Sequence, residues 1–170
     1  MRFRTVGNKY DVGFIVVRNS LSSTIPSGSP VFFVMNGTND GLDVTTANAA
    51  AGAGQEFLAG ILIGDLAASA YGEAQVYGIC QNTRVVTFTR TASTDSYNSA
   101  TAIVVGDVMQ INTLTSVNAI SRSAAGAATA ILPNIFAAAA YTSTASQSSS
   151  FDTTSRTAIT TMLKTFLRIL

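Results

Sequence analysis

The chain has 170 residues, of which 47% are hydrophobic and only 11% are charged, and its mean hydropathy is +0.34. This length is typical of a single domain with one substantial core. In an ordinary soluble domain about 25% of the residues are charged, so this chain has less than half of the usual charge with which to cover a wet surface. The composition therefore indicates apolar surface that is reserved for contact with other protein.

The residue types that are missing exclude several classes of active site. Histidine is absent and Cys80 is the single cysteine. A zinc site built from histidine and cysteine is excluded, as are Ser-His-Asp and Cys-His nucleophiles, because each needs an imidazole. One cysteine cannot form an intrachain disulfide, and we expect Cys80 to be a small buried apolar residue. The sequence therefore predicts a protein that is not an enzyme and that has neither a metal nor a cofactor.

The charge pattern and the hydrophobic runs argue against nucleic-acid and membrane partners. The net charge is +1 and the ten basic residues are scattered, which leaves no footprint for a phosphate backbone. The first residues lack the unbroken apolar stretch of an export signal. The longest apolar runs, such as 14–17 and 61–63, are far shorter than the roughly 18 residues of a membrane span.

Short β-branched runs separated by glycine, with many threonines and serines and few lysines and glutamates, predict a mostly-β domain. The alternation of side chains and the flanking turn residues indicate the following strands in chain order: Val12 to Arg18, Pro30 to Met35, Phe57 to Ile63, Glu73 to Cys80, Arg84 to Arg90, and Ala102 to Ile111.

Two turns are predicted from their residue types. Ile25-Pro26-Ser27-Gly28 fits a type I turn, with proline second and glycine fourth. In the 102–111 strand, Gly106-Asp107 predicts a turn that joins two short antiparallel strands as a hairpin.

The remaining segments are less regular. Residues 45–54 predict a loop or a short helix, and the Ala/Ser/Thr-rich residues 121–150 predict a flexible stretch. At the end of the chain, residues 155–170 fit an amphipathic helix, while 165–170 fit a closing strand equally well. We favour a short helix near 155–163 that runs into a final strand.

The nine acidic residues are the only groups that could act as acid or base. A glycosidase-type pair, such as Glu56 with Asp65 or Glu73, would have to face a cleft. Most of the aspartates instead stand beside turn residues, where the carboxylate bonds to its own backbone; these are Asp11, Asp40, Asp43, Asp65, Asp95 and Asp107.

Two binding sites are weighed against plainer interpretations. Residues 36–43 place oxygen-bearing side chains at close spacing, as calcium requires, but the glutamate and the flanking helices of an EF-hand are missing. The five tyrosines, Tyr10, Tyr71, Tyr77, Tyr97 and Tyr141, could form a platform for sugar rings. For residues 36–43, aspartates in a turn are the favoured interpretation. For the tyrosines, protein contacts are favoured over sugar binding, because the chain has no tryptophan.

Four segments, taken in order, carry a resemblance to a known group of proteins. They are Ile25 to Val31 (IPSGSPV), Phe57 to Leu62 (FLAGIL), Gly72 to Ile79 (GEAQVYGI) and Val105 to Val108 (VGDV). Their order resembles that of the decoration, or cement, proteins of tailed-phage capsids. The resemblance covers roughly residues 12–111, with a looser similarity at Lys164 to Ile169, and the stretch 121–150 departs from the shorter members.

The resemblance implies a compact antiparallel β-barrel or β-tulip-like body over residues 12–170, preceded by an extended N-terminal arm over residues 1–11. It also implies a homotrimer on the outer surface of an icosahedral capsid, bound to the major capsid protein and made in the host cytoplasm. The arm would contact the capsid through apolar and basic side chains: Arg2, Phe3, Arg4, Val6, Lys9 and Tyr10. Without the resemblance, the same residues would be interpreted as a frayed terminus.

A non-enzymatic virion structural protein is thus the leading hypothesis. A different virion component, such as a fibre, spike or tail part, is the first alternative, and the second is a secreted carbohydrate-binding module or glycan-active hydrolase.

Overall fold

The computed structural model describes residues 2–6, 10–35, 37–46, 57–88, 103–111, 120–122, 135–141 and 159–169. Ten β-strands lie within these residues: β1 (Arg2–Val6), β2 (Tyr10–Asn19), β3 (Pro30–Phe33), β4 (Asp43–Thr45), β5 (Leu58–Leu62), β6 (Tyr71–Phe88), β7 (Met109–Ile111), β8 (Ile120–Arg122), β9 (Ile135–Ala137) and β10 (Ile159–Arg168). The prediction of a mostly-β fold is confirmed.

Five of these strands close into a ring. The order around the ring is β2, β4, β3, β5 and β6, and β6 returns to pair with β2. The ring is compatible with the predicted barrel, although β2 and β4 run parallel to each other. β3 is antiparallel to β4 and therefore runs opposite to β2, so the chain returns to the direction of β2 in β4.

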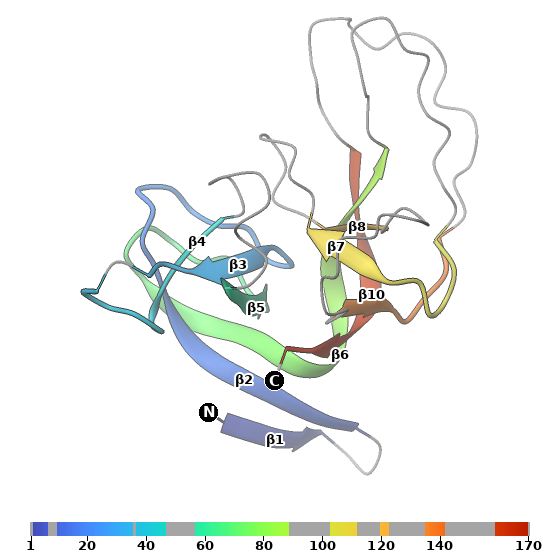
Figure 1. The fold of residues 1–170 in the computed structure, drawn as a ribbon, viewed down its shortest axis with the longest axis horizontal. Helices are drawn as coiled ribbons and strands as arrows, with labels where there is room; N and C mark the ends of the chain where they lie inside the picture. Colours follow the sequence, from blue (N-terminus) through green and yellow to red (C-terminus); the bar gives the residue numbers. More distant parts are fainter. Residues whose placement is uncertain are drawn as a thin grey trace, which may run out of the picture.

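The long strand β6 extends beyond the ring and organises the other half of the molecule. Its later residues pair with β10, which in turn pairs with β9, and β8 pairs with both β6 and β7. Figure 1 shows β3, β4 and β5 on one side, β7, β8 and β10 on the other, and β6 passing beneath both groups. At the opposite edge, β1 lies against β2.

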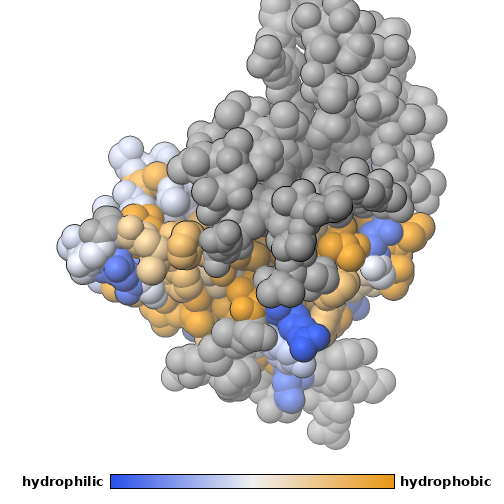
Figure 2. Space-filling model, in the orientation of Figure 1, coloured by the Kyte–Doolittle hydropathy of each residue, from blue (hydrophilic) through white to orange (hydrophobic). Residues whose placement is uncertain are grey.

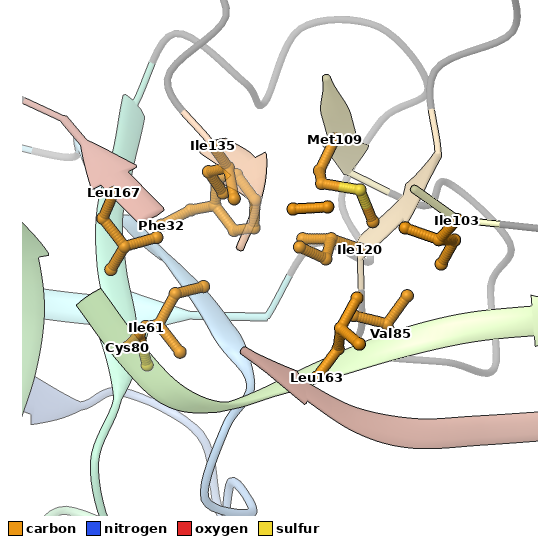
Figure 3. Packing of buried hydrophobic residues seen from close by; sticks show 11 residues of the cluster. Phe32, Ile61, Cys80, Val85, Ile103, Met109, Ile120, Ile135, Leu163 and Leu167 are labelled. Atoms are coloured by element: carbon orange, nitrogen blue, oxygen red, sulfur yellow. The ribbon is translucent and has the colours of Figure 1, made fainter. Parts of the chain in front are cut away.

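The buried side chains form two clusters that meet at the ring. The first cluster fills the space between β6, β10 and the shorter strands (Figure 3), and it consists of Phe32, Ile61, Cys80, Val85, Ile103, Met109, Ile120, Ile135, Ala137, Leu163 and Leu167. The second cluster fills the ring interior and consists of Val17, Ile25, Val31, Val44, Ala59, Leu62, Leu66 and Ala74. Alternate residues of β5 point to different clusters, Ile61 to the first and Leu62 to the second.

The strands predicted at 73–80 and 84–90 are one continuous strand as far as Phe88, where the described part of this segment ends. The polar residues between them do not interrupt β6. The pairing between β6 and β10 instead shifts register between Leu163 and Thr165, so that Thr83 and Cys80 both face inward. A bulge of this kind lets a strand bend while it keeps its partner.

Both turn predictions need correction in detail. The first turn spans residues 26–29, where the Ser29 N–H donates to the Pro26 carbonyl at 3.3 Å, and Gly28 has a φ of 77°. A glycine with positive φ at the third position is typical of a type II turn. A turn is also present at Gly106, which has a φ of 93°, but the expected hairpin is wrong because the two sides pair elsewhere. Ile103 pairs with Tyr141, and Val108 pairs with Phe136.

The end of the chain is a strand. β10 covers Ile159–Arg168, so the helix expected near 155–163 is wrong from residue 159 onward, and residues 155–158 lie outside the described residues. β10 pairs with β6 on one side and with β9 on the other, and alternate β10 residues lie in the core. The strand periodicity of two residues is therefore correct here, and the helical periodicity that the sequence also allowed is not. Within the Ala/Ser/Thr-rich stretch, residues 121–122 belong to β8 and 135–137 form β9. The loop or helix predicted at 45–54 lies mostly outside the described residues.

Candidate functional site

The backbone of the predicted N-terminal arm forms a hairpin on the edge of the sheet. Arg2 pairs with Phe14, Arg4 with Val12 and Val6 with Tyr10. Phe3 lies in the same strand, and Lys9 is outside the described residues. In the described part of the chain, β1 pairs only with β2. Five of the six candidate contact positions, all except Lys9, thus lie in the first two strands.

Three of the four segments that carry the family resemblance meet in space. Gly28, in the first segment, donates its N–H to the Leu62 carbonyl at 2.8 Å and accepts the Arg84 N–H at 2.8 Å. Leu62, at the end of the second segment, pairs with Ala74 in the third. The fourth segment, Val105 to Val108, lies apart from these, next to β9.

Two glycines permit the close approach of these segments. A Cβ atom at Gly28 would lie 2.6 Å from the backbone oxygen of Asn82, and one at Gly60 would lie 2.7 Å from the backbone oxygen of Gln75. Any larger residue would therefore push the 26–29 turn and β5 away from β6. The glycines that the sequence suggested as turn markers serve here as packing positions.

Three acidic side chains of the described residues bond to the backbone of turns. Asp40 accepts the Gly37 N–H at 2.8 Å and Asp107 accepts the Val104 N–H at 2.9 Å, which confirms the turn role for these two. Asp65 accepts the N–H of Ser27 at 2.7 Å and thereby links two separate turns. Within the described part of the chain, no group of three or more His, Cys, Asp or Glu residues could hold a metal ion.

The candidate acid pair and two further acidic positions have different outcomes. Glu73 is an exposed β6 residue and Asp65 is exposed in its turn. Glu56 and Asp95 lie outside the described residues, so the pairing of Glu56 stays untested. Asp11 is exposed on β2.

Asp43, the last residue of the candidate calcium segment, forms an ion pair instead of a turn. Its two carboxylate oxygens accept from Arg18 Nε at 2.6 Å and from Arg18 Nη2 at 2.7 Å, and Oδ2 also accepts from Asn39 at 3.2 Å. The hydrogen bonds from Arg18 lower the pKa of Asp43, against the opposing effect of burial. The same bonds raise the pKa of Arg18. This two-pronged pair fixes β4 beside β2.

Asn19 is a second buried polar residue that the sequence did not single out. Its side-chain amide donates to the carbonyls of Ser23, Leu66 and Ala67 at 2.8, 3.0 and 3.1 Å. It therefore ties the loop after β2 to the loop between β5 and β6. An asparagine that follows a β-branched run is a weak signal for such a role, because asparagine is equally common in plain turns.

The prediction for Cys80 is confirmed, since its side chain is buried in the first cluster. Burial raises the pKa of the thiol, and only partly offsetting hydrogen bonds come from Thr83 and Asn82. A protonated, enclosed thiol is a packing residue and a poor nucleophile.

The described tyrosines do not share one face. Tyr71 is 63% exposed at the start of β6, whereas Tyr141 packs against the first cluster. Tyr77 is half-buried and meets Phe166 edge to face, with ring centroids 5.9 Å apart. Tyr97 and the side chain of Tyr10 lie outside the described residues.

Large apolar side chains are exposed on several strands and turns, and Figure 2 shows hydrophobic residues over much of the described surface on one side of the molecule. The exposed large apolar residues are Val16, Met35, Phe57, Ile63, Tyr71, Val104, Val105, Val108 and Met162. Such surface is characteristic of contact with other protein when it forms continuous patches.

Comparison with known protein families and with curated proteins finds no match. Among the described residues, no helix has both the length and the apolar character that a membrane crossing requires.

Proposed function

We propose that this chain is a non-enzymatic structural protein of a virion, which decorates the outside of an icosahedral capsid as a homotrimer and stabilises it by bridging major capsid protein subunits. The observation that carries the proposal is the packing of three resemblance segments around Gly28 and Gly60. These segments are distant in sequence but pack together in one ring of strands. Their contacts support the proposal because they tie the order of the motifs to one part of the fold.

The way in which polar residues are used also supports a binding role. Asp43, Asp65 and Asp107 hold strands and turns together. Exposed valines, an isoleucine and two methionines meanwhile remain on the surface of a weakly charged chain. Apolar surface combined with structurally engaged carboxylates suits assembly better than hydrolysis.

The mechanism is multivalent attachment. A trimer that touches several capsid subunits holds each further contact at a high effective concentration once the first has formed. The added association free energy opposes outward displacement of the subunits by packaged DNA. The edge hairpin of β1 and β2, with Arg2, Arg4 and Tyr10, is the proposed capsid contact.

The test first asks whether a gene for a major capsid protein lies beside the gene for this chain, and then uses shells assembled from that capsid protein. We expect the purified protein to co-sediment with expanded, undecorated shells and to raise the temperature at which they disrupt. The matched variant removes both cationic side chains of β1 by Arg2→Ser/Arg4→Ser, and it should bind more weakly. Absence of binding by the unmodified protein to expanded shells would overturn the proposal.

A further inference from the structure

An apolar row crosses four neighbouring segments on one outer face of the molecule. Phe166 in β10 lies opposite Ile79 in β6 and opposite Phe136 in β9, and Phe136 pairs with Val108. Directly opposed residues of paired strands share a face. Ile79, Phe136 and Phe166 are half-buried, and Val108 is exposed. The row is therefore continuous and reaches the surface.

Positive charge flanks this row. Lys164 and Arg168 stand two residues before and after Phe166 on β10, and residues two apart on a strand share a face. The neighbouring carboxylate, Asp107, accepts the Val104 N–H at 2.9 Å. We call Ile79, Val108, Phe136, Lys164, Phe166 and Arg168 the cationic patch.

A second apolar surface lies on the ring. Val16 in β2 is directly opposite Glu73 in β6, and the Ile63 N–H donates to the Glu73 carbonyl at 3.3 Å. These three residues thus form a row across β2, β6 and the end of β5. Val16 and Ile63 are 58% and 48% exposed, and Tyr71 extends the surface along β6.

The charge of this second surface is opposite to that of the first. Glu73 is exposed in the centre of the row, and Asp65 follows two residues after Ile63. Two cationic positions lie near this row: Arg18, which Asp43 already neutralises at 2.6 Å, and Arg2, which β1 places opposite Phe14, two residues before Val16. We call Val16, Ile63, Asp65, Tyr71 and Glu73 the acidic patch.

The two patches belong to opposite faces of β6. Ile79 alternates with Cys80, a member of the first cluster, so Ile79 faces away from that cluster. Glu73 shares its face with Gln75, which pairs with Ile61 of the same cluster. The pairing of β6 with β2 shifts register between Gln75 and Tyr77, so the alternation of β6 side chains changes between Glu73 and Ile79. One strand therefore presents the cationic patch on one face and the acidic patch on the other.

We propose that the cationic patch of one copy of this chain binds the acidic patch of a second copy, so that the homotrimer closes head to tail. The inference rests on the proposed function for the number of copies, and it adds which surfaces meet. Two different, complementary surfaces on one chain favour a head-to-tail contact, and such a contact closes into a ring when successive copies are related by a rotation that returns to the first copy. The apolar rows supply buried area, while the opposite charges select the partner surface and its orientation.

Charge reversal on exposed residues tests this contact in the full-length protein, with mass measured by light scattering after size-exclusion chromatography. Glu73→Lys and Arg168→Glu each place like charges across the contact, and we expect either variant to weaken assembly by about tenfold or more. The double variant restores opposite charges in reversed positions and should return to the mass of the unmodified protein.

The control variants are Ser22→Lys and Ser22→Glu, which alter charge at an exposed loop residue outside both patches. They should leave the mass unchanged. We expect every variant to fold, because the substituted residues are exposed. Far-UV circular dichroism and thermal unfolding check this for each variant.

The outcomes separate this inference from the proposed function. The inference is overturned if both single variants keep the mass of the unmodified protein, or if the double variant does not return to that mass. If the protein still binds shells in either case, the proposed function stands. If the reversals behave as expected but no variant binds shells, the head-to-tail contact stands and the capsid function falls. A purified protein that remains monomeric at all concentrations overturns the contact.

Discussion

At the scale of single residues, glycines with the same backbone conformation have different roles. Gly28 and Gly41 have φ angles of 77° and 79°. A Cβ atom at Gly41 would meet nothing within 4 Å, whereas one at Gly28 would press against the Asn82 carbonyl and the side chains of Arg84 and Met162. A substitution at either glycine would therefore strain the backbone conformation, but only a substitution at Gly28 would also disturb packing.

We expect Gly41→Ala to lower the free energy of unfolding by about 1 to 2 kcal/mol, the cost of placing an L-residue in the left-handed region. Gly28→Ala should lower it by about 3 kcal/mol or more, because a backbone oxygen must also move. Urea unfolding followed by circular dichroism measures both. Equal losses for the two variants would contradict the packing role of Gly28.

The ion pair of Arg18 and Asp43 makes stability depend on pH. The lowered pKa of Asp43 means that its carboxylate binds protons less readily in the folded protein than in the unfolded chain. The stabilisation is therefore present above the ordinary carboxyl range and is lost as the pH falls through the lowered folded pKa.

We expect Asp43→Asn to lower the thermal midpoint at neutral pH, and the difference from the unmodified protein to shrink as the pH falls below about 4. Differential scanning calorimetry across this range measures the effect. Asp11→Asn, at an exposed aspartate, is the control and should change the midpoint little. A difference that does not vary with pH would show that Asp43 acts through packing instead of charge.

At the scale of elements, the contact between β6 and β10 contains a buried polar pair. The hydroxyls of Thr83 and Thr165 are 2.6 Å apart, and both residues are fully buried. The pair lies at the register shift between the strands. The two hydroxyls thus form a hydrogen bond with each other beside an apolar cluster. This bond lies where the register between β6 and β10 shifts.

We expect Thr165→Val to destabilise the protein by about 1 to 3 kcal/mol, because the Thr83 hydroxyl is left buried without its partner. The double variant Thr83→Val/Thr165→Val should cost less than the sum of the two single variants, since it removes both polar groups. Urea unfolding of the four proteins completes the cycle. Additive losses would mean that the two hydroxyls do not depend on each other.

At the scale of the whole molecule, two clusters share one backbone. Ile61 and Leu62 are neighbours on β5, yet they contribute to different clusters. β6 borders the ring with its first residues and carries Cys80 and Val85 in the first cluster. The continuous strand β6 joins the ring to the part of the molecule around β10. The acidic patch and the cationic patch therefore lie at different positions along this one strand. The proposed head-to-tail contact belongs to this scale.

The sequence by itself determined the mostly-β character and the positions of the main strands, because alternation and turn residues act over short distances. The strand at Val12 to Arg18 is confirmed within β2, and the one at Phe57 to Ile63 contains β5. The buried role of Cys80 followed from residue type alone.

Only the tertiary structure decided features that depend on distant partners. The strand at the end of the chain required β6 and β9, and the pairing of Asp43 with Arg18 required β4 to lie beside β2. The two patches likewise gather residues from strands far apart in the chain. The physical reason is that a strand's hydrogen bonds and one of its faces are completed by other strands, and local sequence does not specify which strands those are.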